Sequence, residues 1–137
     1  MKTSLAIGKD RVRNATAASL NEKIDQEIQG NIRHYSTADS KAIKDRIRQL
    51  DKEWDIERAL ELNASLVALG GVLLAATVNK KWLILPAIVT SFLAQHAIQG
   101  WCPPVPLFRK LGIRTQKEIE AERHGLLDVL DGRGERL

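Results

Sequence analysis

Two uncharged apolar runs, residues 62–78 and 82–98, dominate the pattern of the chain and are separated only by Asn79-Lys80-Lys81. At about 1.5 Å per helical residue each run spans roughly 25 Å, and flanking residues extend both toward the roughly 30 Å hydrocarbon thickness of a bilayer. A turn this short allows only an antiparallel return of the chain. The pattern therefore predicts a transmembrane helical hairpin over residues 59–101.

Residues 1–58 are predicted to form a cytoplasmic region of amphipathic helices. Apolar residues recur every third or fourth position in two stretches, first Leu20, Ile24, Ile28, Ile32 and Tyr35, then Ile43, Ile47, Leu50 and Trp54. Ser19 with Glu22 predicts the cap of the first helix, and residues 36–40 predict a break. The two helices would pack antiparallel and bury each other's apolar stripes, although the first stripe could instead bind a membrane surface or a partner.

The second of these helices has two possible endings. Because no Gly or Pro occurs between Ser36 and Leu69, it could run unbroken into the first apolar run. It could equally bend at the membrane interface, and the pattern does not distinguish the two.

Residues 102–137 are predicted to form a cytoplasmic proline-rich exit and a C-terminal amphipathic helix. Pro103, Pro104 and Pro106 predict an extended or turn conformation, with Arg109-Lys110 at the lipid headgroups. Thr115 is expected to cap a helix from Gln116 to about Leu130, with Glu118 completing a capping box. The predicted fold is thus an all-α membrane protein, a two-span antiparallel hairpin flanked by amphipathic helices.

Aromatic and small residues support the hairpin. Trp54, Trp82 and Trp101 lie at the edges of the apolar runs, and tryptophan favours the headgroup level of a bilayer. Small residues lie along both runs, where they would let helices approach closely in lipid. These expected helix-packing positions are Ala64, Ala68, Gly71, Ala75, Ala87, Ser91 and Ala94.

Charge and composition narrow the location and the class of protein. The net charge of +4 arises from mixed blocks of both signs, which argues against a nucleic-acid partner. Basic residues near the spans are much more numerous on the side of the termini than in the Lys80-Lys81 turn, so both termini are predicted to be cytoplasmic. A single cysteine excludes an internal disulfide and a cysteine-rich metal site.

The segment Gly100-Trp101-Cys102-Pro103-Pro104-Val105-Pro106-Leu107-Phe108-Arg109-Lys110-Leu111-Gly112-Ile113-Arg114-Thr115 resembles the exit motif of the YgaP-like transmembrane domain family (DUF2892). Positions Gly100, Cys102, Pro103, Leu111, Gly112 and Thr115 match, whereas Pro104-Val105-Pro106 looks like an insertion. The resemblance covers at most residues 58–115. It implies a small bacterial inner-membrane protein that pairs its hairpins as a homodimer or larger homo-oligomer. The rhodanese domain of some members has no counterpart here, because no cysteine precedes Cys102.

Two features are candidates for chemistry near the cytoplasmic end of the second run. Gln95, His96 and Gln99 form a possible intramembrane polar cluster, which is costly and often functional, although such residues also cap bundles or bind water. Cys102 is a possible functional thiol, because Arg109 and Lys110 would lower its pKa. A packed interfacial cysteine is the plainer alternative.

No phosphate-binding loop, nucleophile elbow, paired catalytic carboxylates or metal-ligand spacing occurs, so neither an enzyme, a cofactor nor a metal is predicted. The leading hypothesis is a membrane interaction or scaffold protein that self-associates or docks a partner through its helices. One alternative is a sulfur-handling or small-solute transport module that uses Cys102. Another is a soluble helical bundle that buries residues 60–101.

Overall fold

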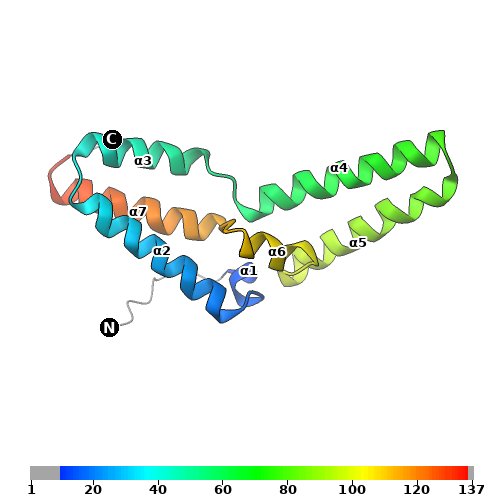
Figure 1. Cartoon of the computed structure of the whole chain (residues 1–137), viewed down its shortest axis with the longest axis horizontal. Coiled ribbons are helices and arrows are strands. Elements are labelled where there is room, and N and C mark those ends of the chain that lie inside the picture. Colours follow the sequence, from blue (N-terminus) through cyan, green and yellow to red (C-terminus); the bar gives the residue numbers. More distant parts are fainter. Residues whose placement is uncertain (1–9, 136–137) are drawn as a thin grey trace.

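The computed structural model describes residues 10–135, whose regular elements are all helices, with no strand among them (Figure 1). The all-α prediction is confirmed for this part of the chain. Six α-helices and one 3₁₀ helix follow a short first turn. In chain order the elements are α1 (Arg11–Asn14), α2 (Ala18–Ser36), α3 (Ser40–Lys52), α4 (Ile56–Thr77), η1 (Lys80–Leu83), α5 (Ile84–Gln99), α6 (Pro104–Lys110) and α7 (Gln116–Gly132).

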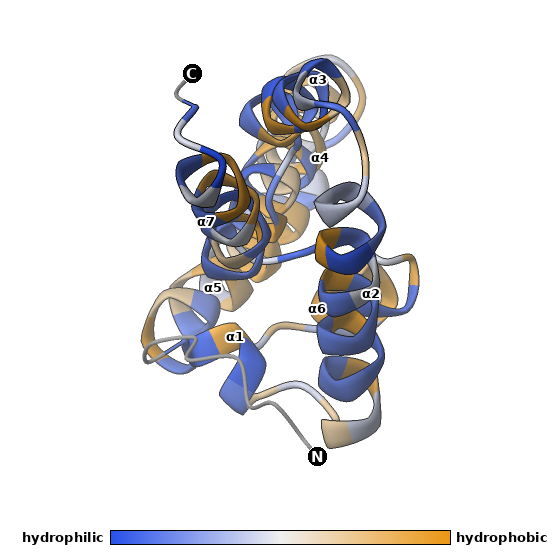
Figure 2. Cartoon of the chain, turned by 90° about the vertical axis from the view of Figure 1, so that its left-hand side faces the viewer, coloured by the Kyte–Doolittle hydropathy of each residue, from blue (hydrophilic) through white to orange (hydrophobic). Residues whose placement is uncertain are grey.

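Helices α2, α3 and α7 form a bundle at one end of the molecule (Figures 1 and 2). Its core consists of Ile43, Ile47, Leu50, Ile119, Leu126 and Leu130, with Tyr35 packed against it. Both α2 and α3 pack mainly on α7 and touch each other only briefly. The expectation that the first two helices bury each other's stripes is therefore wrong, because each of them packs mainly against the C-terminal helix.

Three helix boundaries test the capping predictions. Thr115 caps α7 and Glu118 reaches back to its backbone, so the predicted capping box is confirmed. The predicted Ser19 cap is wrong, because α2 begins one residue earlier behind Ala17 without a side-chain cap. Helix α3 ends at Lys52 and Asp55 caps α4 by accepting a hydrogen bond from the Arg58 amide at 2.7 Å, so the chain breaks before the first apolar run.

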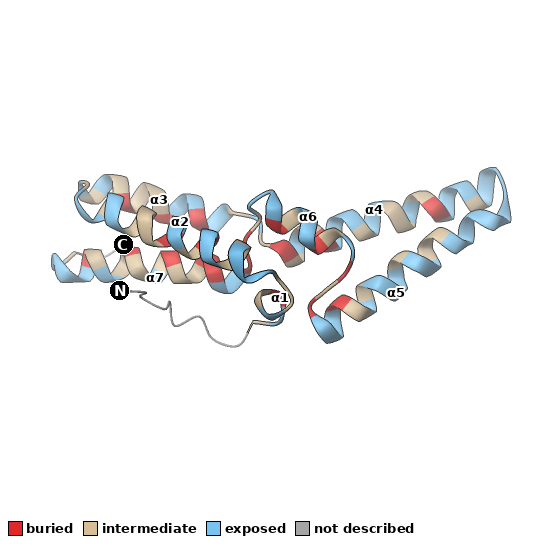
Figure 3. Cartoon of the chain, turned by 60° about the horizontal axis from the view of Figure 1, so that its bottom comes forward, coloured by how far each residue is buried: buried red, intermediate tan, exposed pale blue. Residues whose placement is uncertain are grey.

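Helices α4 and α5 run side by side in opposite directions and extend away from the bundle (Figure 1). At 1.5 Å per residue the 22 residues of α4 measure about 33 Å. By length and composition, two helical stretches could cross a membrane, one ending at Thr77 and the other covering Lys80–Gln99. Most of their surface is exposed in the single chain, as the pale blue ribbon of Figure 3 shows.

The proline-rich exit is helical, which corrects the prediction of an extended segment. Pro103 is the N-cap of α6, and Pro104 and Pro106 lie in its first turn. The first amides of a helix have no intrahelical acceptor, so proline costs little there. Val105 is consequently buried beside Ile56 and Leu60 of α4, and α6 connects the hairpin to the bundle.

Candidate functional site at the base of the hairpin

The base of the hairpin is the region where α4 begins, α5 ends, and α1 and α6 pack against them. A second apolar cluster fills it, separate from the bundle core, with members Val12, Ile56, Leu60, Cys102 and Val105. Because α1, α4, α6 and the loop after α5 all contribute to this cluster, it fixes the position of the hairpin relative to the rest of the chain. Both groups of candidate residues lie at or beside it.

His96 joins the two helices of the hairpin through Glu57. Its Nε2 lies 2.8 Å from Oε2 of Glu57, so the imidazole donates to a carboxylate 39 residues away in the chain. The His96 side chain is 4% exposed, whereas that of Glu57 is 44% exposed. Nδ1 of His96 has no partner in the described part of the chain. The pair ties the first turn of α4 to the last turn of α5.

The predicted polar cluster is divided by this arrangement. Gln95 Nε2 donates to Gln99 Oε1 at 3.2 Å on the outer side of α5, while His96 is buried. The structure therefore does not bring all three side chains together. The functional relationship that sequence reasoning missed is the one between His96 and Glu57. Its signal was the placement of Glu57 at the entrance of the first span, directly across from the end of the second.

Helix α1 covers the end of α5. The Arg11 guanidinium donates to the Ala97 carbonyl. Gly100 adopts φ +75°, and a Cβ on it would lie 2.5 Å from the carbonyl carbon of Arg11. Only glycine combines this left-handed conformation with such a close backbone approach. Gly100 thus lets the chain turn from α5 toward Cys102 directly beneath α1.

Cys102 is buried and 4% exposed, which corrects the expectation of an activated thiol. Burial raises the pKa of the Cys102 thiol, and the nearby negative charge of Glu57 raises it further. Of the two basic residues expected to favour the thiolate, Arg109 binds Glu118 instead and Lys110 is exposed. The site therefore favours a neutral thiol, which is a weak nucleophile.

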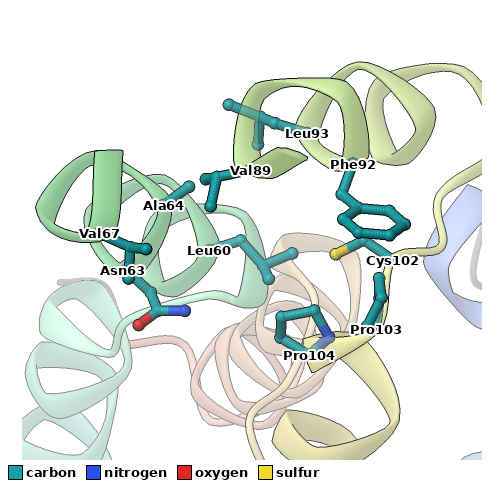
Figure 4. A pocket seen from close by; sticks show the side chains of 10 residues that line it. All are labelled: Leu60, Asn63, Ala64, Val67, Val89, Phe92, Leu93, Cys102, Pro103 and Pro104. Carbon is teal, nitrogen blue, oxygen red and sulfur yellow. The ribbon is translucent and has the colours of Figure 1, made fainter. Parts of the chain in front are cut away.

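An apolar cavity of about 190 Å³ lies between α4 and α5 beside Cys102 (Figure 4). The sulfur of Cys102 and the ring of Phe92 border it from one side, and Pro104 lies across from Leu60. Its lining residues are Leu60, Asn63, Ala64, Val67, Val89, Phe92, Leu93, Cys102, Pro103 and Pro104. The lining carries no charged group and Asn63 is its one polar side chain, so the cavity favours an apolar occupant.

Arg109 does not lie at an exposed, headgroup-facing position, contrary to the sequence expectation. Its guanidinium donates to both carboxylate oxygens of Glu118 at 2.6 Å, and both side chains are fully buried. Arg13 of α1 and Asn21 of α2 complete the cluster, at 2.8 Å from Glu118 and 2.9 Å from Arg109 respectively. Burial alone would raise the pKa of Glu118, but hydrogen bonds from Arg109 and the Thr115 amide outweigh it and hold that pKa below its ordinary value.

A second buried ion cluster lies one helical turn along α7. Arg114 donates to Glu122 at 2.5 Å and also binds Glu53, which lies between α3 and α4. Arg46 of α3 binds the other oxygen of Glu122 at 2.9 Å. The Arg114 carbonyl also accepts a hydrogen bond from the Ile56 amide at 2.9 Å. Arg114 therefore holds the elbow before α4, residues 53–55, in place. These contacts raise the pKa of Arg114 despite its burial.

The predicted helix-packing residues fall into two groups. On α4, Ala64, Ala68 and Ala75 are half-buried and Gly71 is buried against α5. On α5, Ala87, Ser91 and Ala94 are exposed in the single chain. Their surfaces are therefore available for packing against another chain.

Within residues 10–135 no three His, Cys, Asp or Glu side chains are placed to hold a metal ion. The arrangement at the hairpin base can position helices and exclude water, and it presents no nucleophile with a general base. No family model, curated protein or solved structure matches the chain. The resemblance to the YgaP-like family therefore stays a prediction.

Proposed function

We propose that this chain is a small membrane-anchored interaction protein, with α4 and α5 inserted in a bilayer and the α2, α3 and α7 bundle outside it. The observation that carries the proposal is the exposed apolar surface of the hairpin. Its large exposed side chains are Leu62, Leu66, Leu69, Val72, Leu73, Leu74, Val78, Leu83, Ile84, Ile88, Phe92 and Ile98. A soluble monomer rarely exposes a continuous patch of this kind.

Burial distinguishes this hairpin from the core helices of a soluble protein. Only 11% and 6% of the residues in its two apolar windows are buried, although a core helix would be mostly buried. The bundle, in contrast, has its own complete core and outward-facing charges. The soluble alternative, in which a bundle buries residues 60–101, receives correspondingly less support.

The flanking charges support a cytoplasmic bundle. Exposed or half-exposed cations such as Lys44, Lys52 and Arg58 lie on the bundle side, whereas the tip of the hairpin has Lys80 and Lys81. Loops rich in Lys and Arg stay in the cytoplasm. We place the protein in a bacterial inner membrane with both termini inside, as its resemblance to the YgaP-like family implies.

The interaction role follows from what the bundle can do. Two buried ion clusters join α7 of the bundle to α6 and to the elbow before α4, so a partner bound to the bundle is held close to the hairpin. Self-association through the hairpin is part of the proposal. The sulfur-handling or transport alternative that uses Cys102 is less well supported, because the thiol is buried and its pKa is raised.

Extraction of membranes with alkaline carbonate tests the proposal, because it releases peripheral proteins and leaves spanning ones in the pellet. The full-length protein is expected in the pellet. Leu69→Arg with Ile88→Arg would place charges in the middle of both spans, at a cost of about 3 kcal/mol each, and should move protein to the supernatant. Ser19→Arg, at an exposed position on α2, is the matched control and should stay in the pellet. Release of the unmodified chain would overturn the proposal.

A further inference from the structure

Two arginines at the base of the hairpin differ from those that hold the fold together. Arg13, Arg46, Arg109 and Arg114 each bind a carboxylate of the chain. Arg58 is exposed and makes no ion pair within residues 10–135. Arg11 is also exposed, and within the same residues its guanidinium donates to the Ala97 carbonyl and to no carboxylate. Both guanidinium groups therefore have donors available to a ligand.

The two arginines lie at the same height along the hairpin. Arg58 follows Glu57 in the first turn of α4, and Arg11 contacts Ala97, which follows His96 in the last turn of α5. The Glu57–His96 contact at 2.8 Å brings these two turns level. The arginines are thus at the end of the apolar surface, where a bilayer that surrounds the hairpin would have its headgroups.

An aromatic ring defines this level independently. The Arg58 guanidinium lies 4.9 Å from the centroid of the Trp54 ring, and Trp54 is 47% exposed. Tryptophan at the end of a span favours the headgroup region, and a guanidinium stacked on it keeps its N–H edge available for phosphate oxygens. Of the nearby acids, Glu57 is engaged by His96, Asp55 caps α4 and Asp51 binds Arg123, whereas Glu61 is exposed one turn further along α4.

We propose that Arg58 and Arg11 bind the headgroups of anionic phospholipids at the base of the hairpin. This inference rests on the proposed membrane insertion and specifies its lipid partner. The complementary charge is the argument for the occupant: two unpaired guanidinium groups at the end of an apolar hairpin match phosphate headgroups attached to acyl chains. Each arginine near an anionic surface contributes an approximately fivefold gain in lipid affinity.

The test is a thermal unfolding titration of the full-length protein in non-ionic detergent micelles, followed by circular dichroism. Phosphatidylglycerol is expected to raise the unfolding midpoint more than phosphatidylcholine with the same acyl chains, because a ligand of the folded state stabilises it. Arg11→Gln with Arg58→Gln should weaken the apparent affinity for phosphatidylglycerol about 25-fold. Arg11→Lys with Arg58→Lys keeps the charges and should retain most of the effect.

Arg33→Gln is the matched control, since Arg33 is an exposed arginine on α2. It should leave the phosphatidylglycerol effect unchanged. Inorganic phosphate at equal concentration should not reproduce the effect, and equal stabilisation by phosphate would overturn the assignment to lipid. Equal effects of the two lipids, or an unchanged affinity of the double Gln variant, would also overturn it. None of these results changes the outcome of carbonate extraction, which tests membrane insertion separately from lipid binding.

Discussion

Gly71 of α4 and Pro86 of α5 meet so closely that a Cβ on Gly71 would lie 2.6 Å from Cδ of Pro86. This contact sets the distance between the two helices of the hairpin beyond the apolar cavity. Pro86 lies in the first turn of α5, where its missing N–H costs little and its ring can serve as a packing surface.

Gly71→Ala is expected to destabilise the protein by about 1–3 kcal/mol, because the added methyl group overpacks a contact that cannot relax without moving a helix. Gly70→Ala is the matched control, since nothing lies within 4 Å of a Cβ there. It should be neutral or slightly stabilising. Thermal unfolding in detergent measures both. Pro86→Ala should restore much of the stability of the Gly71→Ala variant, and equal midpoints for the two single variants would contradict the account.

Glu118→Gln is expected to destabilise the bundle by about 3–5 kcal/mol, because it leaves the buried Arg109 without its counter-charge. Denaturant unfolding followed by circular dichroism provides the measurement. Glu27→Gln removes an exposed carboxylate from α2 and should change the midpoint very little. A Glu118→Gln protein as stable as the Glu27→Gln control would show that the Arg109–Glu118 pair does not anchor α6 to α7.

The lowered pKa of Glu118 predicts loss of stability in acid. Its folded-state pKa lies below the ordinary value of 4.5, so its contribution is present above about pH 4.5 and is lost as the pH falls through the folded-state pKa. The unfolding midpoint should be nearly level between about pH 5 and 7 and fall at lower pH. The Glu118→Gln variant should lose less on acidification, and parallel curves for the two proteins would refute this assignment.

Cys102 should react slowly with a charged maleimide while the protein is folded, because the thiol is buried and its pKa is raised. The comparison is Ser19→Cys in a Cys102→Ser background, which places a thiol at an exposed position of α2. The expected rate difference is about tenfold or more in the folded protein and disappears in denaturant. Comparable rates in the folded state would contradict this prediction and show that the Cys102 thiol is accessible and reactive.

The sequence predicts those features that depend on local pattern. The uncharged runs predict the helices of the hairpin, and the spacing of Thr115 and Glu118 predicts the start of α7. The helical α6 was missed because three prolines read as a helix breaker, although all of them fall at positions where no helical hydrogen bond is lost. Whether a proline breaks a helix or fits its first turn depends on where the helix begins, and the local pattern does not give that position.

The candidate site was harder to predict because its contacts join distant parts of the chain. His96 and Glu57 are 39 residues apart, and Arg13 and Glu118 are 105 apart. In a charged, amphipathic segment an arginine is expected to be solvated, so nothing in the local pattern distinguishes buried Arg109 from exposed Lys110. The prediction of an activated Cys102 thiol was wrong for the same reason, because Arg109 binds Glu118 and not the thiol.

Membrane insertion of the hairpin is tested most directly by electron paramagnetic resonance of the full-length protein in liposomes. Spin labels are attached to Leu69→Cys or Ile88→Cys in a Cys102→Ser background, with Ser19→Cys as the aqueous reference. Both hairpin positions carry exposed apolar side chains in the single chain. Labels at Leu69 and Ile88 should collide more with oxygen than with an aqueous nickel complex, the reverse of Ser19. Nickel access at Leu69 and Ile88 equal to that at Ser19 would contradict a membrane-spanning hairpin.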